Sequence, residues 1–304
     1  MDIAPIILFV YNRPWHTKKT VEALQKNELA ELSELIIYSD GPKDTAESST
    51  AVAEVRKYLN GVGGFKKITI VESVKNLGLA NSIITGVTEV VNKYGRVIVL
   101  EDDLVTAPNF LRYMNQALER YENEEQVMQN SGYMFDVDID TETDAVFLPI
   151  TSCWGWSSWK RAWRHFDPLM SGYEKLKRDR ALRHRFDLDG AYNYFNMLKA
   201  QRKGKVDSWG IRWYLSVFMM NGLTLYPART LVKNIGFDSS GRHRCRSSLF
   251  NHTTVDIQSV SYHYNLPEPF LNYDAYNAVV QYLSSKQTIA EKLRSVFCKI
   301  SGSK

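Results

Sequence analysis

Three consecutive carboxylates, Glu101, Asp102 and Asp103, follow an apolar run over residues 96–100. Such a run predicts a buried strand, and three like charges at its end repel one another. A divalent cation would relieve this repulsion, because Mg²⁺ and Mn²⁺ take one or two carboxylates and complete their shell with phosphate oxygens and water. The alternative is an acidic start of the next helix, stabilised by the helix dipole. The strand before the motif favours the metal.

The sequence around this motif alternates between strand and helix patterns. Apolar runs predict strands, and the segments between and after them predict helices: strands over residues 5–11, 34–39, 66–72 and 96–100, and helices over residues 15–27, 44–59, 79–93 and 109–121. Strands separated by helices of this length indicate βαβ units. The fold class is therefore expected to be α/β, with a mostly parallel sheet covered on both faces.

Polar residues follow each of these strands, at the sheet edge where open α/β folds bind their ligands. They are Asn12 and Arg13 after the first strand, Asp40 after the second, Asn76 after the third and the Glu101–Asp103 motif after the fourth. The carboxyl ends of parallel strands share one edge. We therefore expect an arginine, two amides and four carboxylates to gather there.

The second half of the chain has a looser pattern. It predicts strands over residues 131–135, 145–150 and 223–227, a helix over 207–220, a loop over 231–246 and a helical tail over 286–304. No repeat or linker-like segment interrupts the sequence. One compact unit with an elaborated second half is the simplest organisation.

The composition excludes several classes of protein. The 304 residues are 44% apolar and 24% charged, as in ordinary globular chains, and a net charge of +4 is too mild to indicate a nucleic-acid partner. Cys153, Cys245 and Cys298 lack the paired spacing of zinc sites or disulfide frameworks. Without a secretory signal pattern or an apolar stretch of about 18 residues, a cytoplasmic protein is expected.

In chain order, Asn12-Arg13-Pro14, Ser39-Asp40-Gly41, Asn76-Leu77-Gly78-Leu79 and Glu101-Asp102-Asp103 resemble the motifs of nucleotide-sugar-dependent glycosyltransferases of the GT-A fold. The resemblance covers roughly residues 4–250. The pattern is similar to that of bacterial polysaccharide glycosyltransferases and of the N-acetylglucosaminyltransferase I type, whose metal motif is also Glu-Asp-Asp. Four such sites in order after four strands are far more specific than one acidic motif.

The resemblance implies a Rossmann-like nucleotide-diphospho-sugar transferase fold and a metal-dependent hexosyltransferase that uses Mn²⁺ or Mg²⁺. The donor would be a UDP-sugar, and the acceptor a glycan or lipid-linked saccharide in the synthesis of a bacterial surface polysaccharide such as capsule or lipopolysaccharide. Residues 1–125 would bind the nucleotide sugar, residues 126–285 would bind the acceptor, and residues 286–304 would form a basic tail.

The resemblance also assigns the donor site. It implies that Asp103 ligates the metal, that Asp102 lies near the ribose or the water shell of the metal, and that Arg13 approaches the nucleotide and diphosphate. Asp40 would lie near the uracil or ribose, and Asn76 near the nucleotide or donor sugar. The residues alone also allow a surface charge at Arg13, a turn at Asp40 and a cap or turn at Asn76.

On the acceptor side, the resemblance matches Asp207, before Ser-Trp-Gly, to the carboxylate that deprotonates the acceptor hydroxyl in an inverting reaction. A helix N-cap at Asp207 is the alternative. Trp154 and Trp156 flank a glycine and are expected either to face a sugar or to pack in the core. Trp159 and Trp163, at helical spacing, favour the core.

Two basic segments complete the expectations. Residues 234–243 form a polar, glycine-punctuated loop, in which the resemblance makes Arg242 a diphosphate ligand and His243 a metal ligand; a solvated loop is the alternative. The tail over residues 286–304 carries five Lys and Arg against one Glu. It fits either an amphipathic helix at the inner face of the membrane or a helix docked on the domain.

Two other classes of protein stay open at this point. A sugar-nucleotide nucleotidyltransferase shares the sheet and the metal carboxylates, but it usually has a glycine-rich loop after its first strand, and residues 11–14 contain no glycine. A non-catalytic carbohydrate- or nucleic-acid-binding module would explain aromatic residues among the basic residues of 160–185. Such a module would not need three carboxylates at a strand end.

Overall fold

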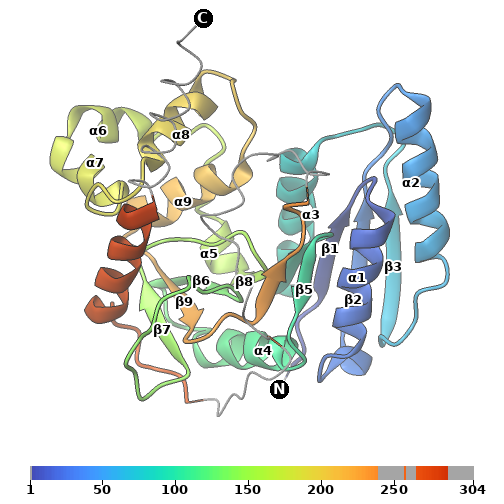
Figure 1. Cartoon of the computed structure of the whole chain (residues 1–304), viewed down its shortest axis with the longest axis horizontal. Helices are drawn as coiled ribbons and strands as arrows, with labels where there is room; N and C mark the ends of the chain where they lie inside the picture. The colour runs from blue at the N-terminus through green and yellow to red at the C-terminus, as the bar shows by residue number, and fades with distance from the viewer. Residues whose placement is uncertain (1, 239–256, 258–264, 287–304) are drawn as a thin grey trace, which may run out of the picture.

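The computed structural model describes residues 2–238, 257 and 265–286 and has an α/β fold (Figure 1). Its central sheet contains eight strands in the order β3-β2-β1-β4-β8-β6-β9-β7. All are parallel to one another except β8 and β7, which are antiparallel to their neighbours. The expected α/β class with a mostly parallel central sheet is confirmed.

The N-terminal half follows the expected βαβ order. Its elements are β1 (Ile6–Val10), α1 (Pro14–Gln25), η1 (Ala30–Leu32), β2 (Glu34–Ser39), α2 (Ala46–Leu59), β3 (Lys67–Glu72), α3 (Leu79–Tyr94), β4 (Arg96–Glu101), β5 (Leu104–Thr106) and α4 (Phe110–Arg120). Every residue of β1 is buried, as expected for an apolar strand between two neighbours in a covered sheet. The four expected strands and four expected helices are confirmed with small shifts at their ends.

The second half adds four strands to the sheet and a group of helices. Its elements are β6 (Val127–Ser131), β7 (Ala145–Leu148), β8 (Trp156–Trp159), α5 (Lys160–Trp163), α6 (Tyr173–Arg178), α7 (Arg180–Phe186), α8 (Tyr194–Arg202), α9 (Trp209–Met219), β9 (Leu223–Pro227) and β10 (Val232–Asn234). Residues 273–286 are also helical. The strands expected near β7 and β9 and the helix expected near α9 are confirmed.

Two expectations for this half were wrong, and one strand of the sheet was missed. A strand was expected over residues 131–135, but the observed strand β6 spans Val127–Ser131 and so ends where the expected one would begin. The segment expected to be a loop from residue 231 begins with β10, which pairs antiparallel with β5. Finally, β8 was not expected at all, although it pairs with both β4 and β6 at the centre of the sheet.

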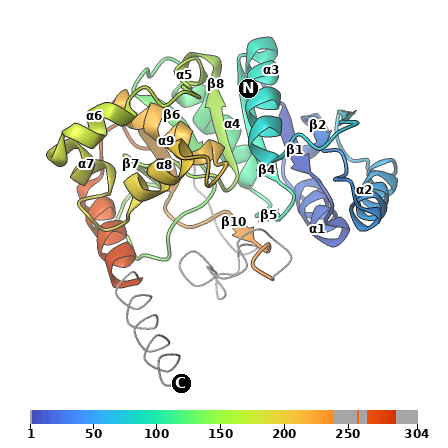
Figure 2. The same cartoon turned by 90° about the horizontal axis from the view of Figure 1, so that it is seen from above.

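Helices cover both faces of the sheet (Figures 1 and 2). On one face, Leu8 of β1 packs in a core shared with α1, α2 and α4. On the other, Ile7 packs in a core shared with α3 and with Trp213 of α9. The alternation of neighbouring β1 residues between the two cores is the pleat of a strand that is buried on both sides. These two cores fix the carboxyl ends of β1, β2 and β4 relative to one another.

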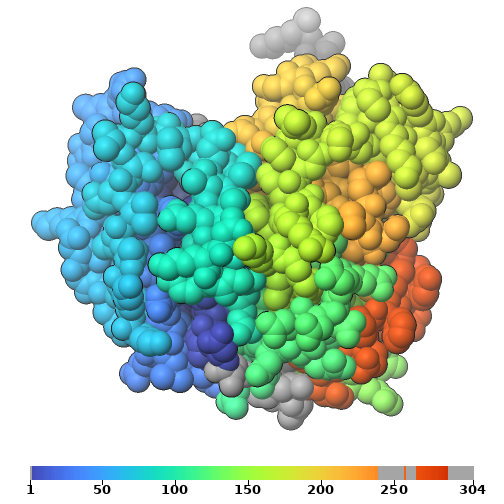
Figure 3. Space-filling model, turned by 180° about the vertical axis from the view of Figure 1, so that it is seen from behind, coloured from blue at the N-terminus to red at the C-terminus, as the bar shows by residue number. Residues whose placement is uncertain are grey.

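A third core joins α6, α7, α8 and α9 to β7 and to the helix of residues 273–286. This core lies in the second half, and α9 contributes residues to it from the side opposite Trp213. Seen from behind, the blue and cyan N-terminal half and the green-to-red second half lie side by side in contact (Figure 3). Among the described residues, no helix combines the length and the apolar character that crossing a bilayer requires.

Candidate active site

Arg13 bridges the two aspartates that follow β4. Its Nη2 donates hydrogen bonds to Asp102 Oδ1 and, over 2.9 Å, to Asp103 Oδ2. Arg13 lies directly before α1 and Asp102 directly after β4, and β1 and β4 are parallel neighbours in the sheet. The edge formed by two adjacent carboxyl ends therefore brings a fixed guanidinium against two carboxylates, as the sequence predicted.

Helix α1 and the 234–236 turn hold this ion pair from two sides. Thr20 Oγ1 of α1 donates to the backbone oxygen of Asp102 over 2.9 Å, and the Ile235 N–H donates to the backbone oxygen of Asp103 over 2.9 Å. A Cβ at Gly236 would overlap the carboxylate of Asp103. Only a residue without a side chain fits so close to the carboxylate, so the chain passes directly over it.

Glu101 links the acidic motif to the second half of the chain. Trp209, the first residue of α9, donates a hydrogen bond to its carboxylate, and Cys153 lies near enough for the two groups to interact electrostatically. Burial, reinforced by the charges of Asp103 and Asp102, raises the pKa of Glu101 to about 8. Its bond to Trp209 ties the end of β4 to the start of α9.

The electrostatics of the Glu101–Asp103 motif reflect crowded carboxylates. Burial raises the pKa of Asp102 to about 6, and the negative charge of Asp103 adds to this effect while the charge of Arg13 opposes it. The side chain of Asp103 is 14% exposed and that of Asp102 only 6%. Asp103 is therefore the carboxylate of this pair that solvent or a ligand reaches more readily.

A divalent cation fits this donor set. Asp102 and Asp103 supply hard oxygen ligands and repel each other, and a single arginine partly compensates their charge. Among the described residues, no three His, Cys, Asp or Glu side chains converge as a ready-made metal cage. Two carboxylates with the remaining positions left to phosphate oxygens and water are the set that Mg²⁺ or Mn²⁺ uses beside a diphosphate.

Asp40 and Asn76 lie together at the ends of β2 and β3. Asp40 is 8% exposed, and its carboxylate accepts four hydrogen bonds of 2.8–3.0 Å, two on each oxygen, from Asn76 Nδ2 and from the backbone N–H groups of Gly41, Leu77 and Gly78. A carboxylate has about four acceptor positions. In this arrangement Asp40 holds the loop after β3 to the end of β2, and Asn76 completes the junction by donating to the Gly41 oxygen over 2.8 Å.

Asp207 lies immediately before α9, at the corner that joins it to α8. The cap of α9 is Ser208, whose side chain accepts a hydrogen bond from the Ile211 N–H, so Asp207 is not the N-cap. Asp207 is half exposed and accepts a hydrogen bond from Arg212 on Oδ1 over 2.8 Å. The bond from Trp209 to Glu101 places this corner on the side of the sheet where the acidic motif lies.

The structure separates the two tryptophans that were expected to face a sugar. Trp154 is partly exposed and contacts the rings of Tyr133 and Phe237. Trp156 is 1% exposed and stacks on Trp209 with 5.2 Å between the ring centroids. The expectation of a sugar contact at Trp156 is corrected, because its ring is enclosed in the core and offers no free face.

Some site residues escaped the sequence analysis, and some expectations cannot be placed. The sequence analysis gave Trp209 and Gly236 no role of their own. Their partners, Glu101 and Asp103, lie more than a hundred residues away in the sequence, so no local pattern indicates these contacts. His16 approaches Asp238 with 3.0 Å between Nε2 and Oδ2, a contact that nothing in the sequence suggested. Arg242, His243 and the tail beyond Lys286 lie outside the described residues.

Comparison with known proteins gives one family match. Residues 6–141 match the family described as Glycosyl transferase family 2. No curated protein matches the chain.

Three solved structures resemble the chain in part. The mannosyltransferase PcManGT from Pyrobaculum calidifontis in complex with GDP-Man and Mn²⁺ has 13% identity and a TM-score of 0.33, and the match covers 52% of this chain and 47% of that one. TarS of S. aureus has 12% identity and a TM-score of 0.31, and the match covers 49% of this chain and 25% of TarS. A UDP-glucose pyrophosphorylase complexed with UDP-glucose has 11% identity and a TM-score of 0.37, and the match covers 76% of this chain and 92% of the pyrophosphorylase. The match spans about half of the mannosyltransferase and a quarter of TarS.

The family match and the site coincide in the chain. Arg13, Asp40, Asn76 and the Glu101–Asp103 motif all lie between residues 6 and 141, at the carboxyl ends of β1 to β4. All of these side chains therefore lie within the part of the chain, residues 6–141, that matches glycosyl transferase family 2.

Proposed function

We propose that this protein transfers a hexosyl group from a nucleotide-diphosphate sugar, a UDP-sugar, to a saccharide acceptor with inversion at the anomeric carbon. The observation that carries the proposal is the Arg13–Asp102–Asp103 cluster at the carboxyl edge of the sheet, in the part of the chain that matches glycosyl transferase family 2. Asp103 and Asp102 would hold Mn²⁺ or Mg²⁺, which when bound offsets the negative charge that develops on the departing diphosphate.

The side chains of the site have separate tasks in this proposal. Arg13 binds a diphosphate oxygen, since its planar guanidinium is already fixed at the strand end. The loop that Asp40 and Asn76 hold in place borders the nucleotide. Trp154, with part of its ring exposed, is the tryptophan of its motif that can meet a sugar.

Asp207 is the proposed general base. Its Oδ1 is bound to Arg212, while Oδ2 forms no hydrogen bond within the described part of the chain. The free oxygen accepts the proton of the attacking acceptor hydroxyl, and the bound one keeps the carboxylate oriented. A glycan or a lipid-linked saccharide in bacterial surface polysaccharide synthesis is the acceptor class we propose, and the protein would act at the cytoplasmic side of the membrane.

Calorimetric titration of UDP tests the donor site. We expect binding in the presence of Mn²⁺, loss of binding with EDTA, and a fall in affinity of about tenfold or more in Asp103→Ala. Asp44→Ala removes the same charge from an exposed position and serves as the control. Metal-independent binding that Asp103→Ala leaves unchanged would contradict the metal assignment.

Turnover distinguishes the proposed transferase from the nucleotidyltransferase class. With a panel of UDP-sugars and saccharide acceptors, we expect release of UDP that depends on Asp207 and is lost in Asp207→Asn without loss of UDP affinity. Release of pyrophosphate from UTP and a sugar 1-phosphate would instead identify a nucleotidyltransferase. UDP release that Asp207→Asn leaves intact would assign the base to another residue.

A further inference from the structure

A strongly basic surface covers the helices of the second half. Residues 173–205, which include α6, α7 and α8, contain ten Lys and Arg residues against four Asp and Glu residues, a net charge of +6. The whole chain has a net charge of +4, so the rest of it is slightly acidic. The three helices lie together at one end of the molecule (Figures 1 and 2). We call this region the α6–α8 surface.

The four acids of this region are engaged within the protein. Each holds a partner: Glu174 pairs with Lys177 at 3.7 Å, Asp179 caps α7 through the Leu182 N–H, Asp187 accepts from the Phe195 N–H over 2.7 Å, and Asp189 accepts from the Tyr276 hydroxyl over 2.8 Å. These bonds stabilise turns and helix ends. The acids thus serve the local fold. Their basic partners on the three helices are Lys177, beside Glu174, and His184, 3.5 Å from Asp189.

Most of the cations, by contrast, point into solvent. Six are exposed and form no ion pair or side-chain hydrogen bond within the described residues, namely Lys175, Arg178, Arg180, Arg202, Lys203 and Lys205. Like charges this close together repel one another and lower the stability of the folded chain. An external anionic partner would remove that cost.

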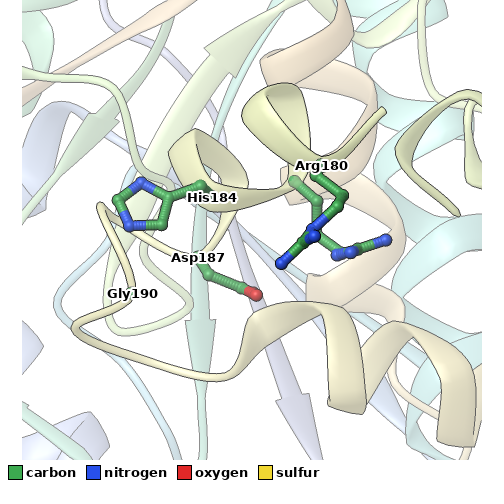
Figure 4. A pocket seen from close by; sticks show the side chains of 5 residues that line it. Arg180, His184, Asp187 and Gly190 are labelled. Atoms are coloured by element: carbon green, nitrogen blue, oxygen red, sulfur yellow. The ribbon is translucent and has the colours of Figure 1, made fainter. Parts of the chain in front are cut away.

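The surface is extended rather than concave. It has two shallow depressions, one of about 440 Å³ lined by Glu174, Lys175, Arg178 and Asp179, and one of about 180 Å³ lined by Arg180, Arg183, His184, Asp187 and Gly190 (Figure 4). Both are open to solvent and lined mainly by charged side chains, unlike the enclosed, mostly apolar pockets that bind small molecules. The cations are instead distributed over three successive helices. A small anion would meet only a few of them, whereas a broad anionic surface would meet them all.

The side chains around the cations favour lipid headgroups over nucleic acid. Proteins that bind single-stranded nucleic acid combine a basic groove with exposed aromatic rings for stacking. Here Phe186 and Phe195 are buried in the core beneath the helices, and the tyrosines of the region, Tyr173, Tyr192 and Tyr194, are only partly exposed. The exposed apolar side chains at the borders of the region are aliphatic, Leu169 before α6 and Val206 after α8, and these suit shallow contact with a bilayer.

We propose that the α6–α8 surface binds the anionic headgroups of a phospholipid bilayer. This inference depends on charge and exposure and does not rest on the proposed transferase activity. It concerns a different part of the chain from the tail beyond residue 286. Because Asp207 follows Lys205 and Val206 directly, membrane contact at this surface would bring the corner before α9 close to the headgroup layer.

Vesicle sedimentation tests the proposal with the full chain. The test variant carries Lys175→Gln, Arg178→Gln, Arg180→Gln and Lys203→Gln. The control variant loses the same charge at exposed positions within or directly beside α1, α2 and β3, with Lys26→Gln, Lys57→Gln, Lys66→Gln and Lys67→Gln. Vesicles of equal parts phosphatidylglycerol and phosphatidylcholine are compared with phosphatidylcholine alone. Thermal unfolding and UDP titration verify that each variant is folded.

We expect the unaltered protein to bind the anionic vesicles and to bind little to phosphatidylcholine alone. Binding to the anionic vesicles should weaken at about 0.5 M salt, because salt screens the attraction between exposed charges. Each cation close to an anionic surface contributes a factor of about five. The four substitutions of the test variant should therefore lower its partition by roughly several hundredfold, and those of the control variant by much less. Equal losses in the two variants, or no binding by the unaltered protein, would overturn the proposal. Tighter binding to single-stranded RNA, lost in the test variant, would overturn it in favour of a polynucleotide surface.

Discussion

Replacement of Asp40 by asparagine tests how the loop after β3 is held. The carboxylate of Asp40 accepts two hydrogen bonds on each oxygen, and all four donors belong to the protein. In Asp40→Asn the amide oxygen can keep one pair of donors. The amide nitrogen then faces the other pair of donors. In one of the two orientations of the amide, this pair is Asn76 Nδ2 and the Gly78 N–H. Donors cannot bond to a donor, so two buried bonds are lost together with the negative charge.

The expected cost follows from these two bonds. A hydrogen bond to a charged group contributes about 1.5–3 kcal/mol net, so the loss of two such bonds in Asp40→Asn should lower the free energy of unfolding by about 3–6 kcal/mol. That is a large part of the roughly 5–15 kcal/mol of a typical domain. Urea denaturation followed by tryptophan fluorescence measures the loss, with calorimetric UDP affinity determined in parallel because the loop borders the proposed nucleotide site.

The matched control is Asp44→Asn, four residues along the chain. Asp44 is exposed and forms no side-chain bond among the described residues, yet the substitution removes the same charge. Its free energy of unfolding should change by no more than about 0.5 kcal/mol. If Asp40→Asn and Asp44→Asn unfold at the same urea concentration, the loop does not depend on the Asp40 carboxylate. If Asp40→Asn weakens UDP binding but unfolds normally, Asp40 contacts the nucleotide directly.

Three further changes have defined outcomes. Gly236→Ala places a methyl group against the Asp103 carboxylate and should reduce the Mn²⁺-dependent affinity for UDP about tenfold, as measured by calorimetry. An unchanged affinity would show that the 234–236 turn moves aside freely. Arg161→Lys removes a guanidinium that donates to three backbone oxygens, so it should lower the free energy of unfolding, measured in urea, by about 2–3 kcal/mol. A change below about 0.5 kcal/mol would refute this role of Arg161. Partial burial acts to raise the pKa of Asp167, but the hydrogen bonds from Ser171 outweigh it and lower the pKa, so the ionised form stabilises the fold at neutral pH. Asp167→Asn should therefore destabilise the protein at pH 7, and the difference should shrink as the pH falls from about 5 to about 3; a difference that grows in acid would reverse the assigned direction.

The N-terminal half was predictable because its strands are purely apolar. β1 and β4 lie in the centre of a covered sheet, and their runs of Ile, Leu and Val leave little choice but a buried strand. Since parallel strands share their carboxyl edge, the residues after them had to converge. The proximity of Arg13 to Asp102, and of Asp40 to Asn76, follows from that rule alone.

The second half was harder because its central strands bury polar side chains. Ser158 of β8 is fully buried and donates to the Met128 backbone oxygen over 2.8 Å. Gln129 of β6 is also fully buried and exchanges two hydrogen bonds with the backbone of Ser152. Hydrophobic periodicity cannot reveal a strand whose polar groups are satisfied by partners more than twenty residues away. For the same reason the sequence left Trp156 open between a sugar-binding loop and the core, where the structure places it.

The position of β8 has a consequence for the order in which the protein is made. Strand β4 is complete at Glu101, but the partner on its outer edge, β8, begins only at Trp156. Throughout the synthesis of the residues between them, a nascent chain exposes a strand rich in Val, Ile and Leu with one side unpaired. Such an edge is a template for pairing with another chain. Helper proteins that shield nascent chains on the ribosome should therefore matter most within this interval, and a pause in translation there would favour aggregation.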